Sequence, residues 1–348
     1  MILGVYPERR HDGSAWLPSD KKRARSRVGK LGARAGLMQI RGVWAFYKEL
    51  FAFPGWNNHG ICWRCAADHS DGVCSFLNLG PHAGWRAHRT TPAQFWAAMR
   101  AQGITPCCLF NLPGVSVDMV TIDVLHCLDL GVSQDLIGNV MWEFIEHGFV
   151  EGSSREKKVK ELFKLLKKHQ KTVDSSNKLQ GLTVEMIKQD KKAPKLRAKG
   201  GETRSLMTFA LEMSITMHQN LQTEHNNAVL QCVSGHMEFY LLMGVDPYKP
   251  DLASAACQKF CTFYSALSKE AQDSHGNDLF WRIKPKFHMY QELAQYQTFV
   301  LGDPKLFWTY KDEDFVGWVA KLARTEGGPK QAATVAKNVL QQYRALSG

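Results

Sequence analysis

The sequence lacks any apolar run that approaches the roughly 18–20 residues of a membrane-spanning helix. The apolar stretch within its first residues, MILGVYPERRHDG, is too short for a signal peptide, and no small-residue cleavage site follows it. Nine cysteines, an odd number without a secretion signal, favour reduced thiols or metal ligands over a disulfide framework. We therefore expect neither a membrane protein, nor a secreted protein, nor a disulfide-stabilised miniprotein.

The sequence also lacks the short motifs of the common enzyme classes. It contains no nucleophile elbow, no P-loop, no GxGxxG, no HExxH and no internal repeat. An ordinary hydrolase or kinase is therefore not indicated. The 348 residues are 44% apolar and 22% charged, which is enough apolar material for a packed core.

The net charge of +11 is concentrated in two segments. Residues 1–42 hold 10 Lys and Arg against 3 acidic residues, and residues 151–200 hold 15 against 6. Such patches are typical of nucleic-acid binders, because each neutralised phosphate releases counterions. The alternative is a solvated tail and a Lys-rich surface helix. The residues expected to bind DNA are Lys21, Lys22, Arg23, Arg25 and Arg27 in the first patch, and Lys157, Lys158, Lys164, Lys167 and Lys168 in the second.

The run KKRARSR at 21–27 also fits a nuclear-import signal, so we expect a nuclear protein.

Hydrophobic periodicity predicts an α+β chain that is predominantly helical. We divide it into a flexible basic arm (1–36), a mixed region with a Cys/His-rich insert (37–150), a basic helix and linker (151–202) and a helical region (203–348). Strands are predicted at 37–40 and over the buried run MVTIDVL at 119–125. Helices are predicted at 44–51, 92–102, 133–146 (capped by Ser133), 155–171, 203–220, 224–243, 252–271, 285–299, 312–325 and 329–346.

The pair Cys62 and Cys65, separated by two residues, is the sharpest local signal. Two thiolates at this spacing can bind one tetrahedral Zn²⁺, so we expect a structural zinc ion. The remaining ligands are open: a local completion uses His69 and Cys74, and a distant one uses a histidine such as His288. His59 is a third candidate. The plain alternative is two partly buried structural cysteines.

Two further groups of polar residues attract attention. Asp123 and His126, in the order D-x-x-H, lie at the apolar end of the predicted strand, where burial is costly unless they are paired or ligated. Glu313 lies between Asp312 and Asp314 at the start of a predicted helix. Without further context, Asp312 is a helix cap, the other two are first-turn acids, and His288 is an ordinary helix histidine.

Taken together, several segments resemble the RNase H-like catalytic region of eukaryotic cut-and-paste DDE transposases. The similarity is to the CACTA-like and Plavaka/KDZ-like groups, more remotely to the catalytic core of the V(D)J recombinase, and spans roughly residues 36–346. It implies a partial RNase H-like α/β core with a large helical insertion between Asp123 and Glu313. The segments are GVWAFYKELFAFPGWN, GICWRC, WRAHRTT, DVLHCLDLGVSQDLIGN, IKPKFHMYQEL and FWTYKDEDFVGWVAKLA.

The resemblance assigns roles to individual residues. Enzymes of this family hold two Mg²⁺ ions with three carboxylates, and Glu313 matches the third acid while Val43 occupies the position of the second. Asp123 and His126 match a structural D-x-x-H signature. The zinc pair, Cys62 and Cys65, is completed in recombinase-like members by distant histidines. His288 matches one of these, and Glu292 or Leu293 stands where a second would be.

The first acid has no match, because only 42 residues, those of the first basic segment, precede Val43. Asp12 and Asp20 have no strand around them. The resemblance therefore implies a truncated, degenerate, mobile-element-derived protein without catalysis, which retains non-specific DNA binding.

Three rival hypotheses remain. One is an active nuclease or transposase that recruits Asp20 or Asp118 and uses Mg²⁺. Another is a zinc-knuckle nucleic-acid binder without a transposase-like fold. The third is a gene relic whose product does not fold stably.

Overall fold

The computed structural model describes residues 14–15, 39–112, 114–173, 175–275, 279–327 and 332–347. The first predicted DNA-binding group, Lys21, Lys22, Arg23, Arg25 and Arg27, lies outside the described residues, as does nearly all of the predicted basic arm.

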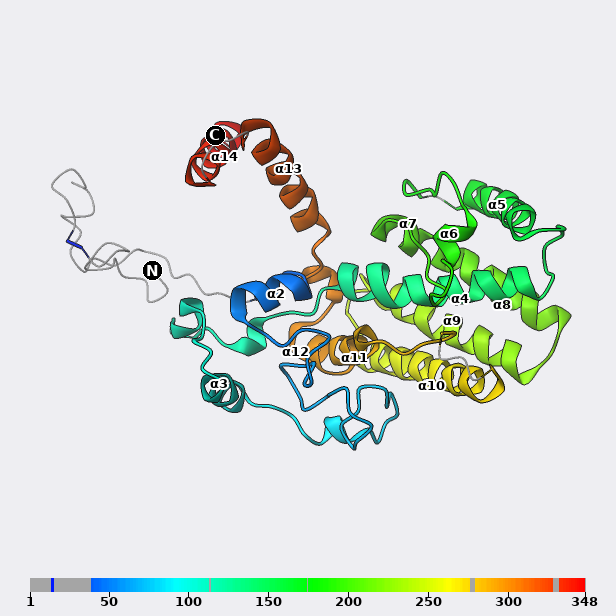
Figure 1. Ribbon diagram of the computed structural model, residues 1–348, viewed down its shortest axis with the longest axis horizontal. Helices are drawn as coiled ribbons and strands as arrows, with labels where there is room; N and C mark the ends of the chain where they lie inside the picture. Colours follow the sequence, from blue (N-terminus) through cyan, green and yellow to red (C-terminus); the bar gives the residue numbers. More distant parts are fainter. Residues whose placement is uncertain are drawn as a thin grey trace.

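The chain is predominantly helical, as the sequence predicted (Figure 1). The α-helices are α2 (Trp44–Phe51), α3 (Pro92–Ala101), α4 (Ser133–Glu146), α5 (Arg155–Thr172), α6 (Val184–Ile187), α7 (Gly200–Ser205), α8 (Met207–Asn220), α9 (Glu224–Leu242), α10 (Pro250–His275), α11 (Pro285–Glu292), α12 (Thr298–Leu301), α13 (Tyr310–Gly327) and α14 (Ala332–Ser347). Two π-helical segments, Leu125–Val132 and Leu293–Gln297, precede α4 and α12. Short 3₁₀ turns cover Gly84–Arg86, Cys108–Asn111, Val117–Met119 and Pro304–Leu306.

The described residues contain no β-sheet, only isolated bridges. The strand expected at 119–125 is wrong: Val120 makes a single parallel bridge with Ile40, residues 121–123 have no regular secondary structure, and a π-helix starts at Leu125. Asp123 accounts for the early helix start, because its carboxylate accepts the backbone N–H groups of Leu125 and His126 as an N-cap does. The RNase H-like sheet therefore has no counterpart in the part of the chain described.

Ser133 does not cap α4, contrary to expectation. The preceding π-helical segment runs directly into α4, and Ser133 has helical backbone angles (φ −66°, ψ −37°). Its hydroxyl lies 2.7 Å from Nε2 of His236 and 2.8 Å from the hydroxyl of Tyr240. The serine therefore ties α4 to α9.

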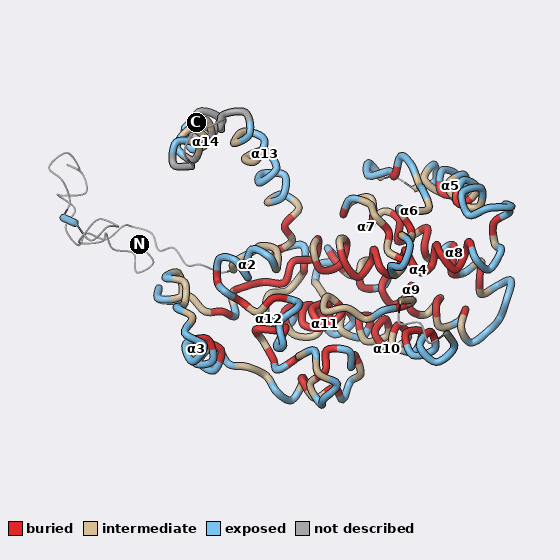
Figure 2. Tube along the Cα trace, in the orientation of Figure 1, coloured by how far each residue is buried: buried red, intermediate tan, exposed pale blue. Residues whose placement is uncertain are grey.

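Helix α4 is the central element of the core. All its residues except Glu146 are buried (Figure 2). Helices α5, α6, α7 and α8 all contact it, and α9 packs against both α8 and α10. Because α4 is covered on every side, it fixes the positions of the surrounding elements.

The helices predicted after residue 203 are present, with two breaks. The helix expected at 203–220 is divided at Leu206 into α7 and α8. The helix expected at 285–299 becomes α11, a π-helical turn and α12. Helix α13 begins at Tyr310, so Asp312 lies in its first turn and is not its cap.

The irregular segment 53–91 packs against α11 and the π-helical turn that follows it. Gln291 donates to the carbonyl of Leu79 at 2.8 Å, and Arg86 donates to Gln295 at 2.5 Å. Helices α13 and α14 project from the body (Figure 1). None of the described helices combines the length and apolarity needed to cross a membrane.

Candidate metal centre

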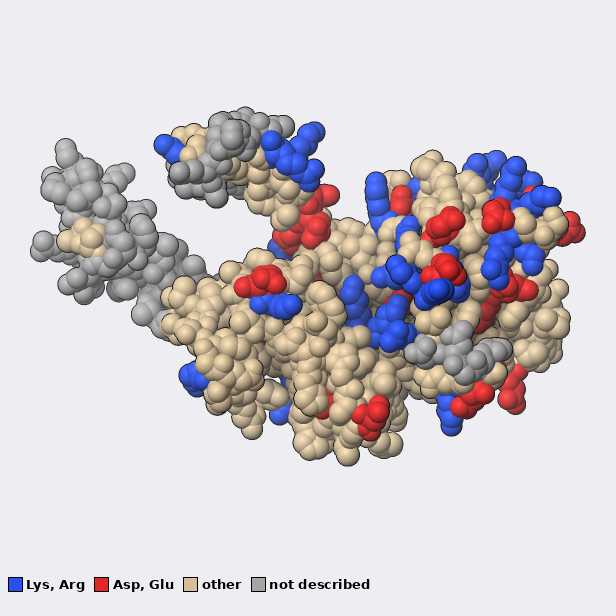
Figure 3. Space-filling model, in the orientation of Figure 1, with Lys and Arg blue, Asp and Glu red and all other residues tan. Residues whose placement is uncertain are grey.

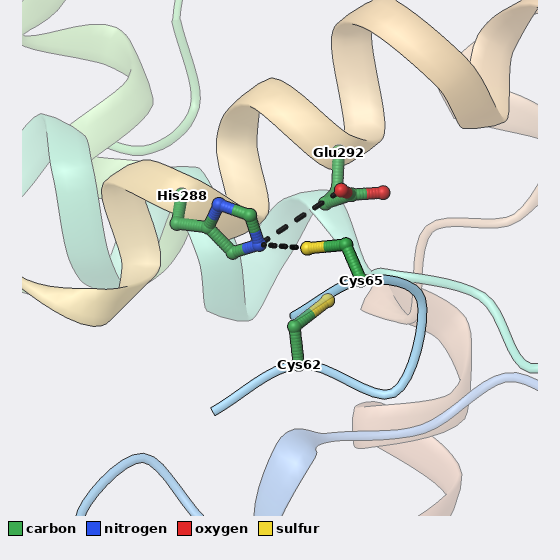
Figure 4. Close-up of side chains that lie close together, drawn as sticks. All are labelled: Cys62, Cys65, His288 and Glu292. Atoms are coloured by element: carbon green, nitrogen blue, oxygen red, sulfur yellow. Dashed lines mark hydrogen bonds and ion pairs between the residues drawn. The ribbon is translucent and has the colours of Figure 1, made fainter. Parts of the chain in front are cut away.

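Four buried side chains converge where the irregular segment meets α11 (Figure 4). The ligand atoms of Cys62, Cys65, His288 and Glu292 all lie within 4.8 Å of one another. Cys65 Sγ is 3.4 Å from His288 Nε2, which is 3.8 Å from Glu292 Oε1. His288 and Glu292 are four residues apart and therefore share one face of α11.

Hydrogen bonds hold the cysteine loop in this position. The backbone N–H of Arg64 donates to Cys62 Sγ at 3.3 Å. Ala66 donates to the carbonyl of His88 at 3.0 Å, and Thr90 donates to that of Arg64 at 2.9 Å. The side chain of Arg64 reaches the carbonyl of Val120 at 2.8 Å. The protein's own hydrogen bonds thus hold the cysteine loop in place.

The electrostatics of the four groups favour one thiolate and one carboxylate. Burial alone would raise the pKa of the Cys62 thiol, but hydrogen bonds from Cys65 and His288 lower it to about 5. The pKa of Cys65 is raised, because its thiol donates to Cys62. Burial would also raise the pKa of Glu292, but the hydrogen bonds and charge of Arg89 hold it below its usual range. Both oxygens of Glu292 pair with Arg89.

The donor set fits a zinc ion. Two sulfurs and an imidazole nitrogen, with a carboxylate oxygen as the fourth donor, are ligand types that Zn²⁺ accepts in tetrahedral sites. His288 Nδ1 is buried without a hydrogen-bond partner, and the ring of Trp85 contacts the His288 ring edge-on at 4.5 Å between centroids. That these residues bind metal remains a prediction.

The structure does not bring the local candidates into this cluster. His69 Nε2 is bonded to the carbonyl of Trp56 at 2.6 Å, and its ring packs on Phe76. Cys74 is half-buried outside the group. His59 is exposed, and its backbone carbonyl accepts the N–H of His69. The geometry therefore favours the distant completion through His288.

A second cluster joins Asp123, His126 and Glu313. Asp123 Oδ2 is 2.7 Å from His126 Nδ1, and the backbone and hydroxyl of Thr309 both donate to the Asp123 carboxylate, at 2.8 and 2.7 Å. His126 Nε2 faces Glu313 Oε1 at 3.5 Å, and Glu313 is 45% exposed. Asp123 is thus saturated with donors, whereas Glu313 faces solvent.

The segment that holds Val43 lies beside this cluster. Gly42 lines a small pocket together with Asp123 and His126, and Arg41 pairs with Asp312 at 3.3 Å. The valine therefore follows a glycine that lines the same pocket as the D-x-x-H pair and an arginine that pairs with the first turn of α13.

Helix α13 is held to the core by residues that sequence reasoning missed. The fully buried Asp129 accepts from the hydroxyls of Tyr240 and Tyr310, the latter at 2.7 Å, and pairs with Arg204 at 3.2 Å. Since Tyr310 is the first residue of α13, this network positions the helix that carries Glu313. Buried Asp–Tyr–Arg groups have no spacing motif, so a single sequence does not reveal them. The pairing of Arg89 with Glu292 was missed for the same reason.

The five predicted DNA-binding lysines of the second patch lie on α5. Lys158 is half-buried and donates to the carbonyl of Ile145 at 3.0 Å, so it fastens α5 to α4. Lys164 pairs with Glu161, and Lys167 lies over the ring of Phe163. Lys157 bonds Ser153, and Lys168 is exposed. Their contact with DNA remains a prediction.

Comparison with known proteins adds no assignment. No family model matches the chain, and no curated protein matches it.

Proposed function

We propose that the chain derives from a DDE transposase, holds one structural zinc ion, no longer cleaves DNA and binds DNA without sequence preference. The observation that carries the proposal is the convergence of Cys62 and Cys65 with His288 across 223 residues, counted from Cys65. The resemblance pairs these same positions. The juxtaposition of Asp123, His126 and Glu313 supports it independently.

In this proposal the zinc ion would be held by Cys62, Cys65 and His288, with Glu292 in the place of a second histidine. Bound there, the ion supplies a cross-link between the irregular segment 53–91 and α11. Structural zinc contributes directly to folding free energy, because the unfolded chain has no such site. The single parallel bridge of Ile40 with Val120 is, on this account, what the described chain retains of an RNase H-like strand pair.

Loss of catalysis follows from the carboxylates around Glu313. Two Mg²⁺ ions about 4 Å apart need several carboxylates to bridge and flank them. Val43 has no oxygen to offer at the second position, and Asp123 is occupied by donors from His126 and Thr309. Glu313 is then left without the partners that would activate a nucleophile.

The rival nuclease hypothesis depends on a recruited acid. The Asp118 carboxylate is bonded to the hydroxyl of Ser116, and Asp20 lies outside the described residues. DNA as partner and a nuclear location rest on the two basic segments.

Plasmid nicking tests the proposal. Supercoiled plasmid is incubated with the wild type, with Glu313→Gln and with Val43→Asp, in Mg²⁺ and separately in Mn²⁺. We expect no nicked product above the protein-free control for any of the three, because one restored acid does not rebuild the site. Nicking by the wild type that Glu313→Gln abolishes would overturn the proposal and establish the active nuclease.

A further inference from the structure

A shallow groove lined by cations lies beside α4, and none of its lining residues belongs to α5, the helix on which the sequence placed the DNA-binding lysines. It is a shallow depression of about 650 Å³, broadly open to solvent, and is lined by Lys192, Lys195, Arg197 and Lys199 together with Gln134 and Glu202. We call it the basic groove. Figure 3 shows Lys and Arg side chains, interspersed with Asp and Glu, over the part of the molecule that carries α4–α7.

The backbone presents three of these cations on one side. Residues 193–199 have no regular secondary structure, and Leu196 is fully buried between the half-buried Lys195 and Arg197. The backbone N–H groups of Lys195 and Arg197 donate to α6 residues, whereas that of Leu196 donates to Gln134 of α4, so successive residues face opposite sides as in an extended chain. In an extended chain every second side chain points the same way, at a repeat of roughly 6.6 Å. Lys195, Arg197 and Lys199 therefore form a row along the groove.

The row is held rigidly against α4. The backbone N–H of Leu196 donates to the carbonyl of Gln134, and the side-chain amide of Gln134 donates to the carbonyl of Ala198, both at 2.8 Å. A Cβ on Gly138 would lie 2.6 Å from backbone atoms of Lys195. The absence of a side chain at Gly138 thus lets the segment that carries the cations pack directly on α4.

Positive charge in the groove exceeds what the protein neutralises. Glu202 is the acidic residue that lines the groove, and it accepts the backbone N–H of Lys199 at 2.8 Å. Asp135, the acid near Lys195, already pairs with Lys284 at 2.6 Å. Lys195 has no ion pair among the described residues. Its pKa is lowered, chiefly by burial, and although Asp135 opposes the shift, Lys284 and Arg197 add to it.

We propose that the basic groove binds the phosphate groups of a nucleic-acid backbone and supplies the main phosphate contacts of this protein. This inference rests on the DNA binding in the proposed function and gives that binding a site. A row of cations along an open groove suits a chain of phosphates, whereas a single free phosphate requires donors that converge on one point. Helix α5 is less suited, because the charge of Lys164 is paired with the carboxylate of Glu161. In the groove, Arg197 donates to the carbonyl of Glu185 and Lys192 to the side chain of Gln189, so their partners are uncharged.

The test compares two matched triple variants of the full chain. One is Lys195→Gln, Arg197→Gln, Lys199→Gln in the groove, and the other is Lys157→Gln, Lys164→Gln, Lys167→Gln on α5. Affinity for a labelled 20-base-pair duplex is measured by fluorescence anisotropy across a salt series. Far-UV circular dichroism and thermal unfolding confirm that both variants are folded. Arg197 also donates to the carbonyl of Glu185 at 2.8 Å, so its loss can disturb the local structure. The double variant Lys192→Gln, Lys199→Gln, at two exposed positions, removes groove charge without touching Arg197.

The groove triple variant should bind the duplex at least tenfold more weakly. Its log–log salt slope should fall by about 2 to 3, since each phosphate contact contributes about 0.9. The α5 variant should change affinity less than threefold. The double variant should weaken binding in the same direction as the groove triple.

Two results would overturn the inference. If the α5 variant loses binding and the groove variant keeps it, DNA binding in the proposed function stands but the site is wrong. In the second arm, pyrophosphate is titrated against the wild type by calorimetry. Binding of pyrophosphate that the groove variant abolishes, with duplex affinity unchanged, would assign the groove to a free phosphate ligand instead.

Discussion

Cys65 Sγ lies 3.4 Å from Nε2 of His288, although 223 residues separate the two in sequence. The contact joins a loop without regular structure to a buried helix. A cross-link at this point closes a very long loop, and the entropy cost of closing such a loop makes the link valuable for folding. Loss of a cluster residue is therefore expected to lower the unfolding free energy of the protein as well as its metal content.

The ion pair of Arg89 with the fully buried Glu292 should contribute strongly to stability. Arg89→Leu leaves a buried carboxylate without its partner, which costs about 3–5 kcal/mol of unfolding free energy in comparable cases. Urea unfolding of the metal-free protein measures the loss. Lys164→Met, which breaks the exposed pair with Glu161, is the control and should cost about 1 kcal/mol or less. Equal losses for the two variants would contradict this account of the Glu292 pair.

His225 should make stability depend on pH. Its ring lies 3.0 Å from Glu143 and 2.9 Å from Glu270. Burial alone would lower its pKa, but hydrogen bonds and charge from the two glutamates raise it from 6.5 to about 9. Because the folded-state pKa is raised, the stabilisation is complete below pH about 6.5 and is lost as the pH rises through 9.

Comparison of the wild type with His225→Gln measures this contribution. The difference in unfolding free energy should be at most about 3 kcal/mol at pH 6 and close to zero at pH 10. A difference that stays constant from pH 6 to pH 10 would show that the ring acts by packing and not by its charge.

The close approach at Gly138 should not tolerate a methyl group. In Gly138→Ala the new Cβ would meet the backbone of Lys195 at 2.6 Å, and backbone cannot move aside as a flexible side chain can. Overpacking of this kind costs about 1–3 kcal/mol. Gly181→Ala is the matched control, since nothing lies within 4 Å of its Cβ position. Thermal denaturation should show a lower midpoint for Gly138→Ala only, and unchanged midpoints for both variants would refute the close approach.

Local sequence signals located the helices but not their breaks. The segment WAFYKELF gave α2 with correct ends because Pro54 and Gly55 follow it and its apolar spacing is helical. The prediction for the run at 119–125 was wrong, because a run of β-branched and apolar residues indicates a strand whether or not a partner strand is present. Only Ile40 pairs with that run among the described residues, and the Asp123 side chain starts a helix instead.

The candidate site was predictable only where a motif or a resemblance marked it. The Cys62–Cys65 spacing predicts a metal-binding pair without further information. Choosing His288 over His69 required knowledge of which distant segments meet, and that came from the resemblance and not from spacing. Arg89 left no trace, because a single arginine in an irregular segment does not reveal a buried partner 203 residues away.

Zinc stoichiometry by native mass spectrometry tests the central claim most directly. The wild type and His69→Ala should each carry one zinc ion per chain, whereas Cys62→Ser and His288→Ala should carry none. His69→Ala is the matched control, because it removes a histidine close to the loop but outside the cluster. Zinc that is lost with His69 and kept in His288→Ala, or a wild type without zinc, would contradict the account.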